Sequence, residues 1–193
     1  KATSNICTSQ VLLAVIASFY AIYHGSDGLK KIAKRVHRLI SIFAAGLQEL
    51  GFELVNKTFF DTITIRVPNK ANKLTVLAQK SHINIRIIDK DTIGIAFDET
   101  TNREDLKNLW QIFSSIEGPA LDIEKLNNSI KENIPSDLLR QSEFLTHDVF
   151  HLYHSETEMM RYMDFLARRD ITLNRSMIPL GSCTMKLNAS TEL

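Results

Sequence analysis

The sequence predicts an α+β fold in which a small, few-stranded sheet is covered by helices. Apolar residues recur at the 3–4 spacing of a helix up to about residue 50. From residue 62 the period changes to the two-residue alternation of strands, and a helix-opening signal follows at residues 101–104. Two long helices, then strand, helix, hairpin and helix, are the composition of a small α+β sandwich.

The first helix is expected over residues 8–23, which are apolar on nearly every side. Such a helix needs cover from a larger body or a partner subunit. The run Gly25-Ser26-Asp27-Gly28 should break it, and Gly51 should stop a second helix that ends near Leu50. One face of this second helix is apolar, made of Leu29, Ile32, Val36, Leu39, Ile40, Phe43, Leu47 and Leu50.

The opposite face of the second helix is basic. It carries Lys30, Lys31, Lys34, Arg35 and Arg38. This face could be a patch for a partner, but solvated faces of amphipathic helices routinely look like this, and the pattern favours that interpretation.

The middle of the chain predicts the sheet. Residues 62–67 alternate as a half-buried strand, residues 71–81 form a helix, and strands at 83–88 and 92–97 are joined by Asp89-Lys90-Asp91. Thr101-Asn102-Arg103-Glu104 is a capping box in which Glu104 answers the cap backbone. The helix that it opens should bury Leu106, Leu109, Trp110, Phe113 and Ile116.

Gly118-Pro119 marks a boundary. Residues 120–146 are polar, apart from a short helix expected over 123–130. A second capping box at Ser155-Glu156-Thr157-Glu158 starts a helix to about Arg168 with Met159, Tyr162, Met163 and Leu166 inward. The predicted organisation is therefore 1–118, two long helices and the α+β domain; 119–154, a connector; and 155–193, a capped helix and a loop.

Composition excludes several classes of function. A net charge of +1 argues against general nucleic-acid binding. No apolar run reaches the roughly 18 residues of a membrane span. Two distant cysteines make neither a disulfide framework nor a zinc site, and they suit a reducing compartment. The 193 residues lack an initiator Met and start and end inside distinctive runs, so we expect a piece of a larger protein.

Local motifs for metal, nucleotide or covalent chemistry are weak. His147, His151 and His154 have zinc-like spacing only if helical, and no Cys or carboxylate completes a site, so no metal is predicted. Phosphate loops of the G-x-x-x-x-G-K-[ST] and G-x-G-x-x-G types are absent. Ser182 and Cys183 have no base placed by local sequence, which makes them poor candidates for nucleophiles.

Three runs of the sequence are long and distinctive enough to indicate a family. Residues 176–188 read Ser-Met-Ile-Pro-Leu-Gly-Ser-Cys-Thr-Met-Lys-Leu-Asn, and small residues of this kind let backbone amides approach a ligand. With Lys1-Ala2-Thr3-Ser4-Asn5-Ile6-Cys7-Thr8-Ser9-Gln10 and His154-Ser155-Glu156-Thr157-Glu158-Met159-Met160-Arg161-Tyr162, they resemble glycine dehydrogenase (decarboxylating), the P-protein family of the glycine cleavage system. The resemblance extends over essentially the whole chain.

The resemblance implies a fold-type-I pyridoxal 5'-phosphate (PLP) enzyme built from two homologous halves. Residues 1–117 would be the tail of the first half, including its small C-terminal domain, and residues 120–193 the connector and entry loop of the second. Gly181, Ser182, Cys183 and Thr184 would then line the cofactor pocket. An ordered loop that only seats the second half remains an equal alternative.

The resemblance does not supply a catalytic residue in this chain. The family's Schiff-base lysine follows a histidine, no His-Lys dipeptide occurs here, and Lys186 lies in the entry loop. No catalytic residue is therefore predicted within these residues. The chain alone should be inactive and should not hold PLP.

For the parent protein, the resemblance implies glycine catabolism: decarboxylation of glycine with PLP as electron sink, and transfer of the aminomethyl group to the lipoyl arm of the H-protein. It also implies a dimer, located in the cytoplasm of a bacterium or the mitochondrial matrix of a eukaryote. Two alternatives stay open: the small domain of another fold-type-I enzyme, such as an aminotransferase, and a non-catalytic interaction or regulatory domain.

Overall fold

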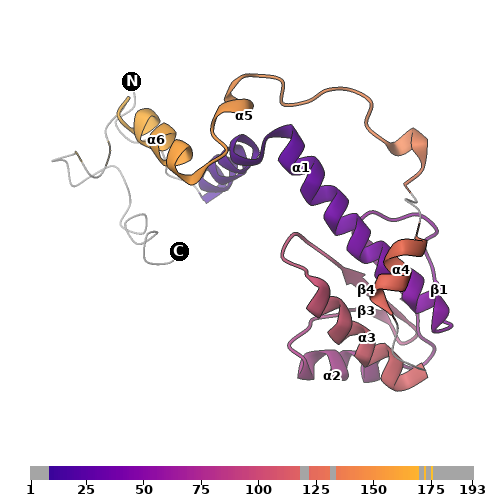
Figure 1. The fold of residues 1–193 in the computed structure, drawn as a ribbon. Helices are drawn as coiled ribbons and strands as arrows, with labels where there is room; N and C mark the ends of the chain where they lie inside the picture. Colours follow the sequence, from indigo (N-terminus) through magenta and orange to yellow (C-terminus); the bar gives the residue numbers. More distant parts are fainter. Residues whose placement is uncertain (1–8, 118–121, 131–133, 170–171, 173–174, 176–193) are drawn as a thin grey trace. The chain divides into compact units, whose positions relative to one another are not determined.

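The computed structural model describes residues 9–117, 122–130, 134–169, 172 and 175. They form two compact units, one drawn from 1–29 with 143–193 and one from 30–142 (Figure 1). This grouping differs from the three consecutive segments predicted from the sequence, because helix α1 (Ser9–Glu49) contributes to both units. The three-segment division of the parent protein stays a prediction.

The predicted break between the first two helices is confirmed. Helix α1 loses helical geometry at Gly25, where φ is 60° and ψ is −174°. Beyond the break the predicted apolar face is buried from Val36 to Leu50, and Leu29 and Ile32 are half-buried. Ile42 and Ala44 are buried as well, on other sides of the helix. The end of α1 is therefore enclosed by more than one element.

The larger unit contains a four-stranded antiparallel sheet. Strands β1 (Glu53–Leu54), β2 (Thr62–Arg66), β3 (Arg86–Asp89) and β4 (Thr92–Ala96) lie in the order β1-β2-β4-β3. Three strands were predicted, with β3 expected to begin earlier, whereas β1 was missed. The β3–β4 ladder carries a register shift between Ile87 and Asp89.

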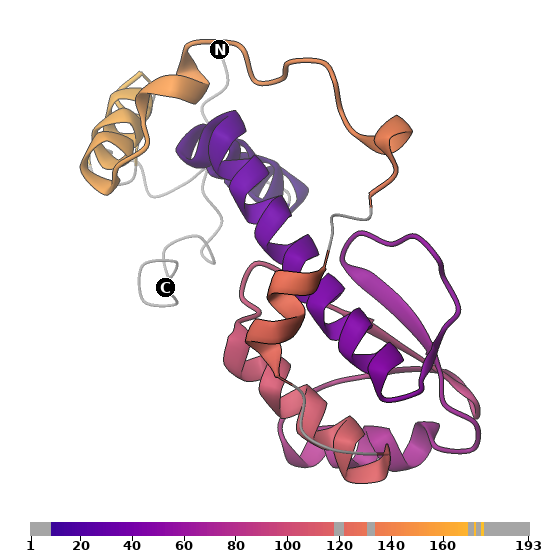
Figure 2. The same ribbon diagram turned by 45° about the vertical axis from the view of Figure 1, so that its right-hand side comes forward.

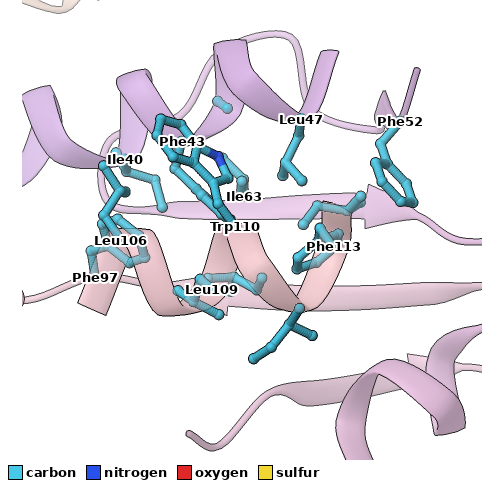
Figure 3. Packing of buried hydrophobic residues seen from close by; sticks show 14 of the residues in the cluster. Ile40, Phe43, Leu47, Phe52, Ile63, Phe97, Leu106, Leu109, Trp110 and Phe113 are labelled. Carbon is cyan, nitrogen blue, oxygen red and sulfur yellow. The ribbon is translucent and has the colours of Figure 1, made fainter. Parts of the chain in front are cut away.

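Alternation along the strands places isoleucines on the buried face of the sheet. Ile63 and Ile65 of β2, and Ile93 and Ile95 of β4, join a core with residues of α1, of α2 (Ala71–Lys80) and of α3 (Arg103–Glu117). Helices α2 and α3 lie side by side in both views (Figures 1 and 2). The predicted helices at 71–81 and after 101 are confirmed, and Figure 3 shows Trp110 and Phe113 of α3 packed against Phe43 of α1.

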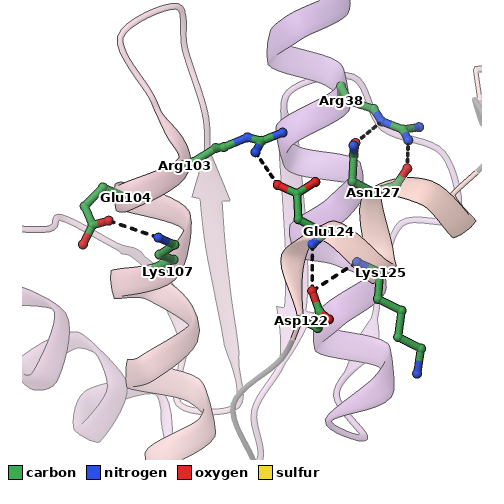
Figure 4. Close-up of polar contacts among 8 residues, drawn as sticks. All are labelled: Arg38, Arg103, Glu104, Lys107, Asp122, Glu124, Lys125 and Asn127. Carbon is green, nitrogen blue, oxygen red and sulfur yellow. Dashed lines mark hydrogen bonds and ion pairs between the residues drawn. The ribbon is translucent and has the colours of Figure 1, made fainter.

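The capping box of α3 was placed one residue too early. Asn102 Oδ1 accepts the Glu104 and Asp105 amides at 2.7 and 3.3 Å, and Asp105 Oδ2 accepts the Asn102 amide at 2.9 Å. Thr101 does not cap α3, because its Oγ1 accepts the Asp98 amide at 3.1 Å and its hydroxyl donates to Asp98 Oδ1 at 3.1 Å. Hydrogen bonds from the Thr100 hydroxyl first, then from its amide and from Thr101, lower the pKa of the Asp98 carboxyl. Side chains of Glu104 and Lys107 instead pair at 3.6 Å (Figure 4).

Helix α4 (Ile123–Ser129) confirms the short helix expected in the connector. Asp122 caps it by accepting the amides of Glu124 and Lys125 at 3.0 and 3.2 Å (Figure 4). Ile123 and Leu126 are buried in the same core as the sheet. A single 3-10 turn, η1 (Ser136–Leu138), follows.

The smaller unit contains the first part of α1, the short α5 (Val149–Leu152) and α6 (Glu156–Ala167). The predicted inward face of α6 is correct for Met159, which is buried, and for the half-buried Tyr162 and Leu166. It is wrong for Met163, which is 48% exposed, because the contacts of α6 are made by the stripe through 159, 162 and 166.

The first part of α1 carries exposed apolar side chains, including Leu12, Leu13 and Ile16. The cover expected for it from a larger body or a partner stays a prediction. Within the described residues, no helix is both long and apolar enough to cross a membrane.

Candidate functional site

The residues predicted to line a cofactor pocket, Gly181, Ser182, Cys183 and Thr184, lie outside the described residues. Their role stays a prediction. The described helix that precedes them in sequence is α6. The groups that hold this helix are therefore described first.

The start of α6 is fixed by the predicted capping box, which is confirmed. Ser155 Oγ accepts the Glu158 amide at 3.3 Å, and Glu158 Oε2 accepts the Ser155 amide at 3.3 Å. The Ser155 hydroxyl also donates to the same carboxylate oxygen at 2.8 Å. Each partner satisfies an amide that the first helical turn leaves without a bond, so the helix begins at a defined residue.

Aromatic rings join α6 to its surroundings. Tyr162 stacks on Tyr153 with ring centroids 4.0 Å apart and planes 12° apart. Phe19 of α1 meets Tyr162 edge-on at 6.2 Å and 66°. The edge-on pair has a favoured geometry for aromatic rings, and both pairs add to the burial of apolar area around α6.

The three histidines considered for zinc have separate environments. His147 Nδ1 accepts the Val149 amide at 3.2 Å, the His151 side chain is exposed, and His154 Nδ1 lies 2.7 Å from the Tyr23 carbonyl oxygen. Helix α5 covers only four residues, so the helical spacing of a zinc site does not arise. The described part of the chain contains no group of three or more His, Cys, Asp or Glu side chains arranged for a metal ion.

Gly25 explains how residues 150–154 approach α1. A Cβ at this position would lie 2.6 Å from the Phe150 carbonyl oxygen and 2.9 Å from His154 Cε1. Its φ of 60° is also a conformation that side-chain-bearing residues rarely adopt. The sequence predicted a break here, but the contact with residues 150–154 is visible only in the structure.

The larger unit contains a cavity of about 330 Å³ beside α1. Its lining is Ser41, Ala44, Ala45, Gln48, Leu54, Asn56, Lys57, Phe59 and Ile130. Lys57 is the one titratable residue in this lining, and it is exposed, so the cavity offers no acid–base pair.

His37, next to this cavity, was missed by the sequence analysis. It is buried, and its Nδ1 lies 2.8 Å from the Phe60 carbonyl oxygen, which can only accept a hydrogen bond. Nδ1 therefore carries the hydrogen, and Nε2 faces the Ser41 hydroxyl at 3.5 Å. The ring also stacks on Phe60 at 5.7 Å. These contacts give His37 a structural role, and its position within a basic run gave no signal of burial.

The basic face of α1 is largely exposed, as the favoured interpretation predicted, but its two arginines also bond to other elements. Arg35 donates to the carbonyls of Glu99 and Thr101, both at 2.8 Å. Arg38 donates to Asn127 Oδ1 at 3.0 Å, to the Ile130 carbonyl at 2.9 Å and to the Asn127 carbonyl (Figure 4). Guanidinium groups offer several donors in a fixed plane, and here they fasten α4 and the loop before α3 to α1.

Comparison with known proteins identifies the family. The family model described as "Glycine cleavage system P-protein" matches residues 1–113. Three curated relatives, each called glycine dehydrogenase (decarboxylating), match all of this chain: 52% identity in Cupriavidus metallidurans, and 53% in Serratia proteamaculans and in Sodalis glossinidius. The chain spans 20% of the length of each of these relatives.

Among solved structures, a NifS-like protein matches with a TM-score of 0.41 and 20% identity over 46% of this chain and 29% of that one. A similarity of this size supports no functional argument. The family assignment rests on the sequence matches, and by these this chain belongs to the glycine cleavage system P-protein family.

Proposed function

We propose that this chain is a segment of a PLP-dependent glycine decarboxylase that transfers the aminomethyl group of glycine to the lipoyl arm of an H-protein and releases carbon dioxide. The observation that carries the proposal is the 52–53% identity, over the whole chain, to proteins called glycine dehydrogenase (decarboxylating). Identity at this level also favours the decarboxylase over another PLP enzyme or a non-catalytic module.

We place the lysine that would hold PLP outside the described residues. An aldehyde cofactor needs a lysine amine held at the bottom of a closed pocket. Every lysine in the described ranges is exposed, except for Lys70, which is half-buried. No catalytic step is therefore assigned to these residues. The cofactor would be held by other parts of the protein, with Gly181, Ser182, Cys183 and Thr184 proposed as contributors.

The described residues can instead act as a scaffold. The sheet with α1, α2, α3 and α4 forms a packed core, and the capped α6 precedes the proposed pocket segment in sequence. In the parent we propose glycine and the lipoylated H-protein as substrates, the remainder of the polypeptide as the main partner, and a dimeric assembly. The relatives are bacterial, which favours a cytoplasmic location.

Exchange of labelled bicarbonate into the carboxyl group of glycine tests the proposal. The full-length protein, with PLP and lipoylated H-protein, should catalyse this exchange. The 193-residue chain alone should catalyse none and should retain no cofactor absorbance after dialysis. A full-length protein that transaminates glycine, or that binds H-protein without any exchange, would favour one of the two alternatives.

Replacing Ser182 or Thr184 by alanine in the full-length enzyme should affect chemistry more than stability. Small polar residues bury little apolar area, so each substitution should cost about 1 kcal/mol or less in the free energy of unfolding. Loss of a hydrogen bond to a charged cofactor or substrate group should slow exchange by about 10- to 150-fold. Exchange rate and thermal midpoint should be measured together.

Ser142→Ala is the matched control, because Ser142 is exposed and precedes α6 by many residues. It should leave both quantities unchanged. Wild-type exchange in the Ser182 and Thr184 variants would show that residues 176–188 only seat the second half, and the pocket assignment would be wrong.

A further inference from the structure

A long-range contact within the smaller unit joins residues 23–25 of α1 to residues 150–154. Four residues make it: Tyr23, Gly25, Phe150 and His154, here called the joint. More than a hundred residues separate its two sides in sequence, and all four belong to the same compact unit.

The joint combines a directional bond with a close backbone approach. A carbonyl oxygen can only accept, so His154 Nδ1 carries a hydrogen and donates it to Tyr23 at 2.7 Å. Beside this bond, the missing Cβ of Gly25 leaves room for the Phe150 carbonyl, which a Cβ would meet at 2.6 Å. A backbone atom cannot move aside as the end of a flexible side chain can, so the position requires glycine.

The joint lies directly before α6. His154 adjoins Ser155, the cap at which α6 begins, and Tyr162, about two turns further on, contacts Tyr153 and Phe19. The joint and the aromatic contacts of Tyr162 therefore hold the first two turns of α6 from either end. A helix held at its cap and along one face has a fixed direction with respect to the segment that holds it.

We propose that the joint is a positioning device of the enzyme: His154 and Gly25 hold α6, the described helix that precedes the proposed pocket residues in sequence, in the orientation that the reaction requires. This inference rests on the proposed function. Neither residue touches substrate or cofactor in it; both are positioning residues.

Variants of His154 in the full-length protein test the directional bond. His154→Ala should lower kcat for glycine–bicarbonate exchange about three- to tenfold, the range expected for losing one hydrogen bond. It should change KM for glycine less, leave the thermal midpoint near the wild-type value, and speed amide hydrogen exchange in residues 156–167. His154→Asn should recover both kcat and protection, because its amide nitrogen occupies about the place of Nδ1. His151→Ala, an exposed histidine of the same segment, should match the wild type.

Two glycines test the close approach. Gly25 and Gly51 both have positive φ, 60° and 87°, but nothing lies within 4 Å of a Cβ at Gly51. Gly51→Ala thus introduces backbone strain alone, whereas Gly25→Ala adds the collision with Phe150. Gly25→Ala should therefore lower kcat and α6 protection further than Gly51→Ala does.

Unchanged α6 protection in His154→Ala, equal effects of the two glycine variants, or a kcat that falls only in proportion to the folded fraction would each overturn the proposal. A wild-type protein without glycine–bicarbonate exchange would overturn the proposed function instead. Amide exchange of α6 would in that case still decide whether the joint holds the helix.

Discussion

Replacing Phe43 by alanine should lower the free energy of unfolding by about 3–5 kcal/mol, the range for removing a large aromatic side chain from a core. Phe43 is fully buried on α1, and its ring meets those of Phe97, Trp110 and Phe113 at 5.6, 6.3 and 5.7 Å (Figure 3). Its loss removes the transfer free energy of the ring and leaves a cavity between α1 and α3. Neighbouring aromatic rings are rigid, so the space cannot close easily.

Urea unfolding followed by circular dichroism measures this effect. Phe165→Ala is the matched control, since Phe165 is half exposed on α6 and its ring lies under Arg169 at 4.3 Å. The control should cost about 1 kcal/mol or less. A loss of less than about 1 kcal/mol in Phe43→Ala would mean that α1 does not pack on α3 in this way.

Replacing Gly46 by alanine should destabilise the protein by about 1–3 kcal/mol, although alanine at an exposed helical position is favoured over glycine by about 1 kcal/mol. A Cβ at Gly46 would lie 2.6 Å from Cζ2 of Trp110, and 2.7 Å from its Cε2 and Nε1. The indole thus lies directly on the backbone of α1. Such an approach leaves no room for a methyl group.

A double-mutant cycle with Trp110→Phe isolates this contact. The smaller ring makes room, so Gly46→Ala should cost less in the Trp110→Phe background than in the wild type. Trp110→Phe also removes Nε1, a buried nitrogen with no hydrogen-bond partner among the described residues, which offsets part of the lost packing. An equal cost of Gly46→Ala in both backgrounds would show that the indole does not limit the approach of the two helices.

Local signals in the sequence were sufficient for most elements. These signals are short-range: the two-residue alternation in β2 and β4, the 3–4 spacing in α1 and α3, the glycine at the break and the Ser155–Glu158 box. Each is confirmed because backbone geometry and burial of one face act at that range. The family, too, was predicted from the sequence runs alone, and the comparisons confirm it.

Candidate site residues were predictable to a smaller extent. Gly181, Ser182, Cys183 and Thr184 were selected through family resemblance, and their role stays a prediction. His154 was noted for a zinc spacing that the structure does not form and as the start of a family run. Its bond was not predicted, because its partner, the Tyr23 carbonyl, comes from a distant segment. Backbone carbonyls carry no sequence signature, so no local pattern could indicate this bond.

The sequence by itself determined the α-helices except the four-residue α5, three of the four strands, the break at Gly25 and the family. Only the tertiary structure decided the rest. Two-residue β1 exists because Glu53 and Leu54 pair with Arg66 and Ile65 of β2, and two residues are too few to show a period. Arg35 and Arg38 bond to backbone carbonyls because a loop and a helix from later in the chain reach them. The capping box of α3 begins at Asn102 and not at the predicted Thr101, because the Thr101 side chain is hydrogen-bonded to Asp98. In each case the deciding partner is a backbone group or a competing side chain whose position follows from the packed fold.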